Sequence, residues 1–214
     1  MDRSIQNCYG RDVGRTMGFD RSAVVDAALD EFWAHGYNGT STERLCAVTG
    51  LGRSSLYNAF HSKRGLYVEC MAAYIEAADR GVDAILSTES TTSVLERISK
   101  IFEVLIDGEM ERRAQGRPSG CFSVNTALEA GDDPEMAEPL KQITVNLRNR
   151  LAIMADYLAA GQAAGDIACT MPPTEQAEVI NGAVVGIRVA ARVGAARSSM
   201  HAIANGTLRA LTPS

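Results

Sequence analysis

No proline occurs before Pro118, and this absence leaves more than half of the chain free to form long, unbroken helices. The apolar residues of this part recur with a helical period, as in the series Val24, Ala28 and Phe32. Alternating apolar and polar residues, which are typical of β-strands, are scarce. The sequence therefore predicts an all-α fold of about nine helices.

The breaks between the predicted helices fall at glycine, proline, serine and threonine. Asp20 is a suitable N-cap for the first helix, and Gly36 is a suitable left-handed residue at its end. The segment Thr40–Glu43 has the form of a capping box for the second helix. The predicted helices cover about residues 21–35, 40–49, 53–60, 63–85, 94–113, 121–130, 134–164, 174–195 and 198–211.

Composition and charge indicate a globular chain with one basic segment. Hydrophobic residues make up 46% of the chain and charged residues 22%, so an ordinary buried core is expected. The net charge is −5, but residues 40–67 carry +3 and residues 68–214 carry −6. A basic patch on an acidic body favours nucleic-acid binding at the patch and disfavours unspecific adhesion elsewhere.

The N-terminal residues and the apolar runs bear on location. No run of 18 apolar residues occurs, so neither a transmembrane helix nor a membrane partner is expected. Residues 1–18 lack the apolar core of a signal peptide, and we expect a cytoplasmic protein with a flexible N-terminal arm. The arm carries Arg3, Arg11 and Arg15, which could reach the minor groove of DNA, but an arm without a role is the simpler expectation.

The sequence indicates neither a metal centre nor a catalytic site. Its five cysteines and three histidines are far apart: Cys8, Cys46, Cys70, Cys121, Cys169, His35, His61 and His201. No Cys-x-x-Cys pair occurs, and no motif of a phosphate-binding loop, a serine hydrolase, a zinc peptidase or a dinucleotide-binding enzyme is found. We therefore expect no metal, no cofactor and no enzymatic activity.

Two short predicted helices joined by Thr49-Gly50-Leu51-Gly52 indicate a helix-turn-helix at about residues 41–60. Leu45, Leu56 and Phe60 can form its shared core, and the second helix then presents polar side chains that read base edges or hold phosphates. A cation at the start of the next helix is unfavourable unless an anion such as a DNA phosphate binds there. The predicted DNA contacts are Thr40, Ser41, Thr42, Arg44, Arg53, Ser54, Ser55, Tyr57, Asn58, His61 and Lys63.

The segment of about residues 19–67 carries a specific set of residues. The set consists of Thr40-Ser41, Leu45, Thr49-Gly50-Leu51, Leu56-Tyr57, Phe60, Ser62-Lys63 and Leu66. It resembles the DNA-binding domain of the TetR family of repressors, and residues 120–129 resemble a stretch found in one branch of that family. The sequence departs from the family pattern at Gly52, where Ser or Thr usually caps the helix, and at Cys46, which replaces alanine. Both replacements are compatible with the fold.

The resemblance implies a DNA-binding domain at residues 19–67 and a ligand-binding and dimerisation domain at residues 68–214. In this family a small molecule binds the C-terminal domain, the fourth helix moves, and a palindromic operator is released because the spacing of the two recognition helices changes. Repression is the usual role, and activation is the alternative. A helical dimeric interaction protein that does not bind DNA is an alternative of another class.

We expect the effector in a cavity between predicted helices five to eight. Asn125 and Tyr157 are of interest there, because a buried polar group needs a partner that a ligand could supply. Most other lining residues are apolar, so fold analogy favours an apolar or aromatic effector. The predicted lining residues are Phe102, Leu105, Cys121, Phe122, Asn125, Leu147, Leu151, Met154 and Tyr157.

Cys121 offers an alternative sensor. It follows Ser119-Gly120 at a predicted helix start, and helix N-termini favour the reactive thiolate form of cysteine. The chain is then a thiol-based repressor that responds to electrophiles or oxidants. The competing interpretation, an inert cysteine that packs in the core, is the commoner one.

Small residues recur at intervals of four in a predicted C-terminal helix, at Gly182, Gly186, Ala190 and Gly194. Glycine inside a helix costs about 1 kcal/mol relative to alanine, so a compensating close contact with another helix is expected. We favour a dimer interface formed by the last two helices of two subunits. Packing against another helix of the same chain is the alternative.

Overall fold

The computed structural model describes residues 18–87 and 92–213, and its regular structure in these ranges is entirely helical. The elements are α1 (Arg21–Gly39), α2 (Thr42–Thr49), α3 (Arg53–Phe60), α4 (Lys63–Leu86), α5 (Val94–Ala114), α6 (Phe122–Ala130), the short 3-10 helix η1 (Pro134–Met136), α7 (Ala137–Ala164), α8 (Pro173–Arg192) and α9 (Arg197–Leu211). The predicted all-α fold is confirmed. The predicted arm, with Arg3, Arg11 and Arg15, lies outside the described residues except for its last residue. In the described ranges, no helix combines the length and the apolar character that a membrane span requires.

Local capping explains where α1 begins and where it bends. Asp20 caps the helix by accepting a hydrogen bond from the backbone N–H of Ser22 at 2.9 Å. Gly36 adopts a φ of 76°, the left-handed region predicted for it. The chain then makes a further helical turn, so α1 ends at Gly39 and not at His35.

The predicted capping box at Thr40–Glu43 is wrong, because the helix begins one residue later. Ser41 is the N-cap of α2, and its hydroxyl accepts the backbone N–H of Arg44 at 3.2 Å. Thr40 is fully buried, and its hydroxyl donates to the carbonyl of Gly36 at 2.7 Å. The bend at Gly36 leaves this carbonyl in need of a donor, and the Thr40 side chain supplies it.

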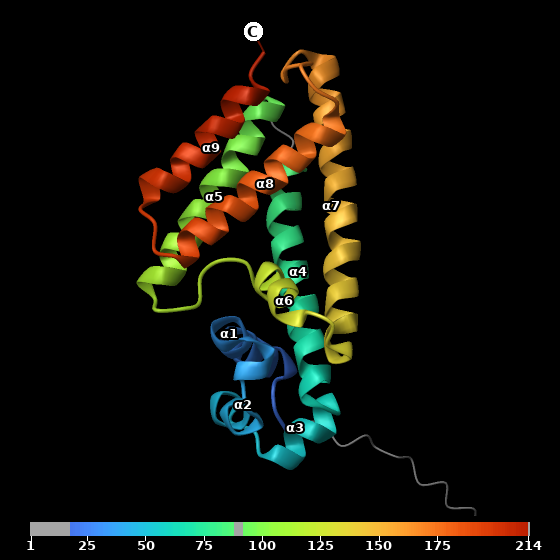
Figure 1. Cartoon of the computed structure of the whole chain (residues 1–214), viewed down its shortest axis with the longest axis vertical. Coiled ribbons are helices and arrows are strands. Elements are labelled where there is room, and N and C mark those ends of the chain that lie inside the picture. Colours follow the sequence, from blue (N-terminus) through green and yellow to red (C-terminus); the bar gives the residue numbers. More distant parts are fainter. Residues whose placement is uncertain (1–17, 88–91, 214) are drawn as a thin grey trace, which may run out of the picture.

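The molecule has a small end and a large end that are joined by α4. α1, α2 and α3 form the small end, and α4 runs from it into the larger group of helices (Figure 1). α7 lies beside α4, and α5, α8 and α9 pack together at the large end. α6 lies at the junction, in contact with both α1 and α4.

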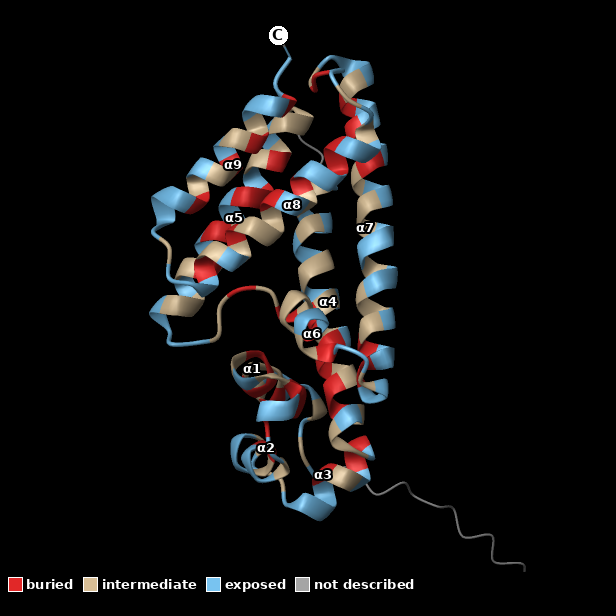
Figure 2. Ribbon diagram, in the orientation of Figure 1, coloured by how far each residue is buried: buried red, intermediate tan, exposed pale blue. Residues whose placement is uncertain are grey.

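Each end has its own hydrophobic cluster, and buried residues lie on the inward faces of the helices (Figure 2). The cluster of the small end is centred on Phe32, Leu45 and Leu56, but it also includes Phe122 of α6 and Met136 of η1. The cluster of the large end is formed by α5, α7, α8 and α9 together with Ile167 in the loop before α8. The small end is therefore held to the rest of the chain through α4, α6 and η1.

Candidate DNA interface and effector cavities

α2 and α3 form the predicted helix-turn-helix, with an interior fixed by leucines. Leu45 of α2 and Leu56 of α3 are both fully buried. Gly50 follows α2 with a φ of 69° and a ψ of 8°, a left-handed conformation that favours glycine. Gly52 then caps α3 without a side-chain hydrogen bond. The turn between the two helices therefore lies where the sequence predicts it.

The outer face of α3 is open to solvent (Figure 2). Its exposed side chains are those of Arg53, Ser54, Ser55 and Asn58. Tyr57 is half-buried, and its hydroxyl lies 3.4 Å from the hydroxyl of Thr42 on α2. A guanidinium nitrogen of Arg53 lies 3.6 Å from the Glu43 carboxylate in an exposed ion pair. Exposed ion pairs of this kind are weak, so Arg53 is free to exchange Glu43 for a phosphate or a base.

Arg44 is held against α1. Its Nε lies 2.5 Å from the carboxylate of Glu31, and its Nη2 lies 2.8 Å from Nε2 of His35. About half of the Arg44 side chain, 52%, is still exposed, so it stays a predicted DNA contact. The prediction of Thr40 as a DNA contact is wrong, because a fully buried side chain cannot reach DNA.

A tight turn connects α3 to α4. His61 is exposed in this turn and has a φ of 65°, the one positive φ outside glycine in the described ranges. Ser62 caps α4 by accepting the backbone N–H of Gly65 at 2.9 Å. Position 65 requires glycine, because a Cβ there would lie 2.1 Å from the carbonyl oxygen of Phe60.

Lys63 opens α4 and contacts the end of α1. Its Nζ lies 4.3 Å from the centre of the Tyr37 ring, the distance of a cation–π contact. Partial burial lowers the pKa of Lys63, and the carboxylates of Glu129 and Glu135 oppose this shift. The sequence predicted a role for Lys63 at DNA, but it did not predict these carboxylates beside it.

α6 and η1 are hydrogen-bonded to the end of α1. The Glu129 carboxylate accepts the backbone N–H of Tyr37 at 2.8 Å and that of Asn38 at 2.6 Å. The Tyr37 hydroxyl donates to Glu135 at 2.5 Å, and burial together with this hydrogen bond raises the pKa of Tyr37. A Cβ at Gly36 would lie 2.5 Å from a Glu129 oxygen, so glycine is needed there for close approach as well as for its φ.

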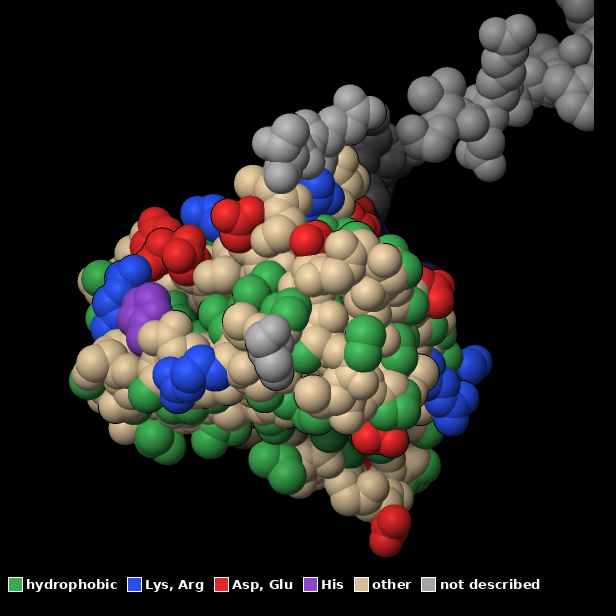
Figure 3. Space-filling model, turned by 90° about the horizontal axis from the view of Figure 1, so that it is seen from above, with side chains coloured by type: hydrophobic (Ala, Val, Ile, Leu, Met, Phe, Trp, Pro, Cys, Tyr) green, Lys and Arg blue, Asp and Glu red, His purple; other side chains and the backbone are tan. Residues whose placement is uncertain are grey.

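The surface charge differs between the two ends. Residues 40–67, which include α2, α3 and the start of α4, carry a net charge of +3. The opposite end of the molecule shows basic and acidic side chains interspersed with hydrophobic ones (Figure 3). The helix-turn-helix is thus the part of the molecule best suited to a polyanion.

Three adjoining cavities lie between α4, α5, α6, α7 and α8. Their volumes are about 220, 340 and 240 Å³. Arg150 of α7 and Val184 of α8 line all three, so the cavities meet around these two residues. Together they place a mostly apolar interior next to the middle of α4.

Five of the nine predicted lining residues border these cavities. Leu151 and Met154 line the first cavity, and Leu105 lines the second. Cys121 and Leu147 line the third.

The other four predicted lining residues border none of the three cavities: Phe102, Phe122, Asn125 and Tyr157. The three cavities do not support the predictions for Phe102 and Phe122, whose rings are each 1% exposed and pack inside the hydrophobic clusters. Asn125 is half-buried on α6. The hydroxyl of Tyr157 is buried without a hydrogen-bond partner in the described ranges, but it lies away from these cavities.

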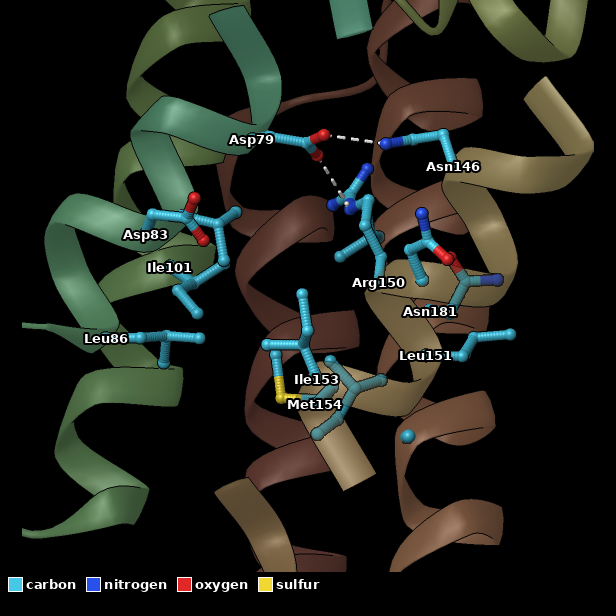
Figure 4. Close-up of a pocket in the computed structure, with 15 residues that line it drawn as sticks. Asp79, Asp83, Leu86, Ile101, Asn146, Arg150, Leu151, Ile153, Met154 and Asn181 are labelled. Carbon is cyan, nitrogen blue, oxygen red and sulfur yellow. Dashed lines mark hydrogen bonds and ion pairs between the residues drawn. The ribbon is translucent and has the colours of Figure 1, made fainter. Parts of the chain in front are cut away.

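The first cavity has a polar end and an apolar end (Figure 4). At the polar end, Asp79 of α4 faces α7, where Nδ2 of Asn146 donates to its Oδ2 at 2.7 Å. Nε of Arg150 lies 3.6 Å from Oδ1 of the same carboxylate. The apolar end includes Leu86, Ile153 and Met154. No sequence motif pointed to this polar group, because its members come from two distant helices.

A second polar group lies between the second and third cavities. Nη1 of Arg188 donates to the Tyr74 hydroxyl, which in turn donates to Sγ of Cys121 at 3.5 Å. Burial raises the pKa of Tyr74, so its hydroxyl keeps its proton. Burial also raises the pKa of Glu109, whose carboxylate accepts the backbone N–H of Gly120 at 2.8 Å.

Gly182 and Gly186 lie on the open side of α8. Apart from the neighbouring residues and backbone of α8 itself, no atom of the described chain lies within 4 Å of a Cβ built at either position, so packing against another helix of the chain does not explain these glycines. Large apolar side chains are exposed along the same helix and just after it: Val179, Val189 and Val193. This part of α8 is therefore an uncovered apolar surface.

The prediction that Ala190 and Gly194 share this surface is wrong. Ala190 packs against the hydrophobic cluster of its own chain. Gly194 lies beyond the end of α8 with a φ of 82°, a conformation that accounts for its glycine. A spacing of four residues exceeds the helical period of 3.6, so each residue of the series is turned further around the helix axis than the one before it. Over three intervals the last residues therefore leave the face on which the first one lies.

Both parts of the chain match known families. Residues 24–70 match the tetR family of bacterial regulatory proteins, and residues 94–209 match the Tetracyclin repressor-like C-terminal domain. The HTH-type transcriptional repressor ComR of Escherichia coli is 30% identical over 203 residues, which cover 94% of this chain and 93% of ComR. The uncharacterized HTH-type transcriptional regulator YezE of Bacillus subtilis is 34% identical over 126 residues, 58% of this chain and 62% of YezE.

Solved structures show the same fold. The TetR family transcriptional regulator CifR, in complex with a 26-bp operator duplex, has a TM-score of 0.77 and 25% identity, covering 92% of this chain and 100% of CifR. The reduced form of Escherichia coli NemR has a TM-score of 0.73 and 17% identity, covering 90% of this chain and 94% of NemR, and it supports the fold alone. The relatives are regulators and not enzymes. The chain therefore belongs to the TetR family of bacterial regulatory proteins and is a helix-turn-helix transcriptional regulator.

Proposed function

We propose that the protein is a cytoplasmic homodimeric repressor that leaves a palindromic operator when a small molecule enters the cavities. The observation that carries the proposal is that α4 belongs to both sites. It begins at Lys63 beside α3, and its segment from Asp79 to Leu86 lines the first cavity. A molecule that displaces α4 would therefore also displace the support of α3. In this division, residues 19–67 bind DNA, residues 68–214 bind the effector and the second subunit, and α4 crosses the boundary.

α6 offers a second connection between the cavities and the DNA-binding end. Cys121, just before α6, lines the third cavity, and Phe122 packs with its ring 6.1 Å from that of Trp33 on α1. Glu129, near the other end of α6, accepts the two backbone N–H groups at the end of α1. A shift of α6 on effector binding would strain these hydrogen bonds and tilt α1 together with the helix-turn-helix.

The open side of α8 supports dimerisation. Gly182 and Gly186 leave room for the backbone of a second helix, and the exposed valines beside them supply apolar area. A symmetric pair of these surfaces would join two subunits and hold their α3 helices at a fixed separation. Adjacent major grooves on one face of DNA are about 34–36 Å apart, so this separation determines operator affinity.

The test begins with selection of DNA fragments by the full-length protein, refolded from denaturant to remove bound small molecules. We expect a palindromic site whose affinity falls steeply and linearly with salt on logarithmic axes, because several phosphates are contacted. Arg53→Ala and Asn58→Ala should weaken binding to this site, whereas Lys100→Ala on α5 removes an exposed cation elsewhere and should not. Binding without sequence preference would contradict the proposal.

A second candidate function, a thiol-based repressor, is favoured by the contact between the Tyr74 hydroxyl and Sγ of Cys121. Arg188 donates to the same hydroxyl, so a cation and a hydrogen-bond donor stand close to the sulfur. Reactive cysteines commonly lie in partly exposed positions near such groups. The thiol borders the third cavity, which gives a small electrophile a place to bind.

N-ethylmaleimide tests this candidate, since it adds the cysteine sulfur to one alkene carbon and a proton to the other. We expect the reagent to release the operator from the wild type and from Cys169→Ser, which removes an exposed cysteine, but not from Cys121→Ser. Complete alkylation of Cys121 with unchanged operator affinity would exclude the thiol mechanism and leave the reversible effector.

A further inference from the structure

Arg188 places a charge inside the effector region without an ion-pair partner in the described ranges. Its Nε is inaccessible to solvent and has no hydrogen-bond partner in the described ranges. Its Nη1 donates to Tyr74, whose burial keeps the phenol neutral. No ion pair links Arg188 to a carboxylate within residues 18–87 and 92–213, although such pairs occur elsewhere in these ranges. An arginine side chain stays charged in proteins. Glu109 attracts this charge electrostatically, but no carboxylate of the described ranges bonds to it directly.

The carboxylates closest to this region are already engaged. Glu109 lines the second cavity and attracts Arg188 electrostatically, but its carboxylate accepts the backbone N–H of Gly120, and burial raises its pKa. Asp79 is paired with Arg150 and accepts a hydrogen bond from Asn146. A buried charge without a partner is costly, so a ligand that brings one negative charge to Arg188 gains more here than in water.

The rest of the region is apolar. The second cavity includes Val82, Ile85, Ile101 and Leu105 in its lining, and it opens toward the first cavity around Arg150 and Val184. A ligand bound at Arg188 would extend its body among these side chains and reach α4. The apolar lining requires that this body be hydrocarbon or aromatic.

We propose that the effector is an organic monocarboxylate with an apolar body, whose carboxylate is held by Arg188. A guanidinium and a carboxylate form strong charge-assisted hydrogen bonds, and one carboxylate would supply both the acceptor that Nε lacks and the ion pair that Arg188 lacks. A dianionic phosphate fits less well, because Arg188 offers one cation and the apolar lining offers no partner for a second negative charge. This inference rests on the proposed function and specifies the chemistry of its effector.

The experiment compares acids with uncharged amides of the same shape. Straight-chain carboxylates from butanoate to dodecanoate and 4-phenylbutanoate are titrated calorimetrically into the full-length protein, each beside its amide. We expect at least one acid to bind roughly tenfold to hundredfold more tightly than its amide, the range expected for a hydrogen bond to a charged group. Equal affinity of acid and amide, or no binding of any acid, would overturn the proposal.

Variants assign the preference to Arg188. Arg188→Met should abolish the acid-over-amide preference while amide affinity is kept, and Arg188→Lys should keep part of it. Arg192→Met removes an exposed cation one turn along α8 and should leave the preference intact. A preference that persists in folded Arg188→Met would overturn the proposal, and if this variant does not fold, the wild-type comparison still decides.

Operator affinity is measured separately by fluorescence anisotropy, with and without the preferred acid. We expect the acid to weaken operator binding by the wild type and not by Arg188→Met. Failure to bind any operator contradicts the proposed function. Operator binding without a preference for the acid over its amide contradicts only the inference that the effector is a carboxylate. The two failures are therefore distinguishable.

Discussion

The helix-turn-helix and the effector cavities both use charged side chains, but they hold them in opposite ways. On α3 the exposed polar residues lie within six positions of the chain, from Arg53 to Asn58, and water solvates them until DNA arrives. In the cavities the contact between Tyr74 and Arg188 joins residues 114 positions apart, and the surrounding protein excludes water. The first arrangement suits a long polyanion that any exposed cation can approach. The second suits one small anion that completes a buried group.

Phe122→Ala should have the largest effect, because this ring connects the two regions. It is 1% exposed and packs against the rings of Tyr67 and Tyr74. We expect the free energy of unfolding, measured in urea, to fall by about 3–5 kcal/mol, with operator and effector binding lost together. Leu128→Ala on the same helix is the control, since Leu128 is 81% exposed. A stable Phe122→Ala protein that kept one function would show that the regions are less connected than the packing indicates.

Arg53→Ala should separate the two regions. Loss of a base or phosphate contact should weaken operator binding by about 1–3 kcal/mol. Binding of the acid identified above should not change, because Arg53 is exposed on α3 and lines none of the three cavities. Fluorescence anisotropy and calorimetry on the same preparation give both numbers. A loss of effector affinity in Arg53→Ala would contradict the conclusion that the two regions bind their ligands independently.

Glu129→Gln should weaken the connection between the effector cavities and the DNA-binding end more than it weakens binding of either the effector or the operator. The N–H groups of Tyr37 and Asn38 bond to different carboxylate oxygens, so the amide keeps an acceptor for one of them, places an NH2 group against the other and loses the negative charge. We expect the free energy of unfolding to fall by about 1 kcal/mol. The effector should also weaken operator binding less than it does in the wild type. Glu138→Gln, at an exposed position of α7, is the matched control, and an unchanged response to effector in Glu129→Gln would rule out the route through α6.

The smallest expected effect is a pH dependence that comes from Glu109. Its pKa is raised above the ordinary value of 4.5, mainly by burial. Glu109 therefore stabilises the fold when it is protonated, and this contribution is lost as the pH rises through the folded-state pKa. The midpoint of thermal unfolding of Glu109→Gln should therefore rise relative to that of the wild type as the pH increases above the ordinary pKa of 4.5. A constant difference between the two proteins would contradict this assignment.

Most of the DNA-binding end could be predicted from the sequence, because its signals are local. The glycines of the turn, the leucines of the core and the polar face of α3 all lie within about twenty residues. The prediction of Thr40 as a DNA contact failed for a reason of tertiary structure. The bend at Gly36 leaves a free carbonyl, and the buried Thr40 hydroxyl donates to it. The hydrogen bonds from α1 to Glu129 could not be predicted, although the segment that contains Glu129 was singled out by resemblance.

The cavities could be predicted only in outline. Their apolar residues follow helical periods, and five of the nine predicted lining residues do border them. Periodicity shows that a side chain points inward, but it does not distinguish a packed ring such as Phe102 from a cavity wall such as Met154. The polar groups around Asp79 and Arg188 depend on how distant helices meet. In the sequence, Asp79 and Arg188 each look like a single charged residue on an ordinary amphipathic helix.

The length of α4 has a mechanical consequence. Its 24 residues correspond to a rod of about 36 Å at 1.5 Å per residue. If the rod pivots near its cavity end, a tilt of about 5° moves its other end by about 3 Å. Two subunits that tilt in opposite directions would double this displacement between their recognition helices. A tilt of α4 that is too small to disturb the packing of the large end would thus move the recognition helices out of alignment with the two major grooves.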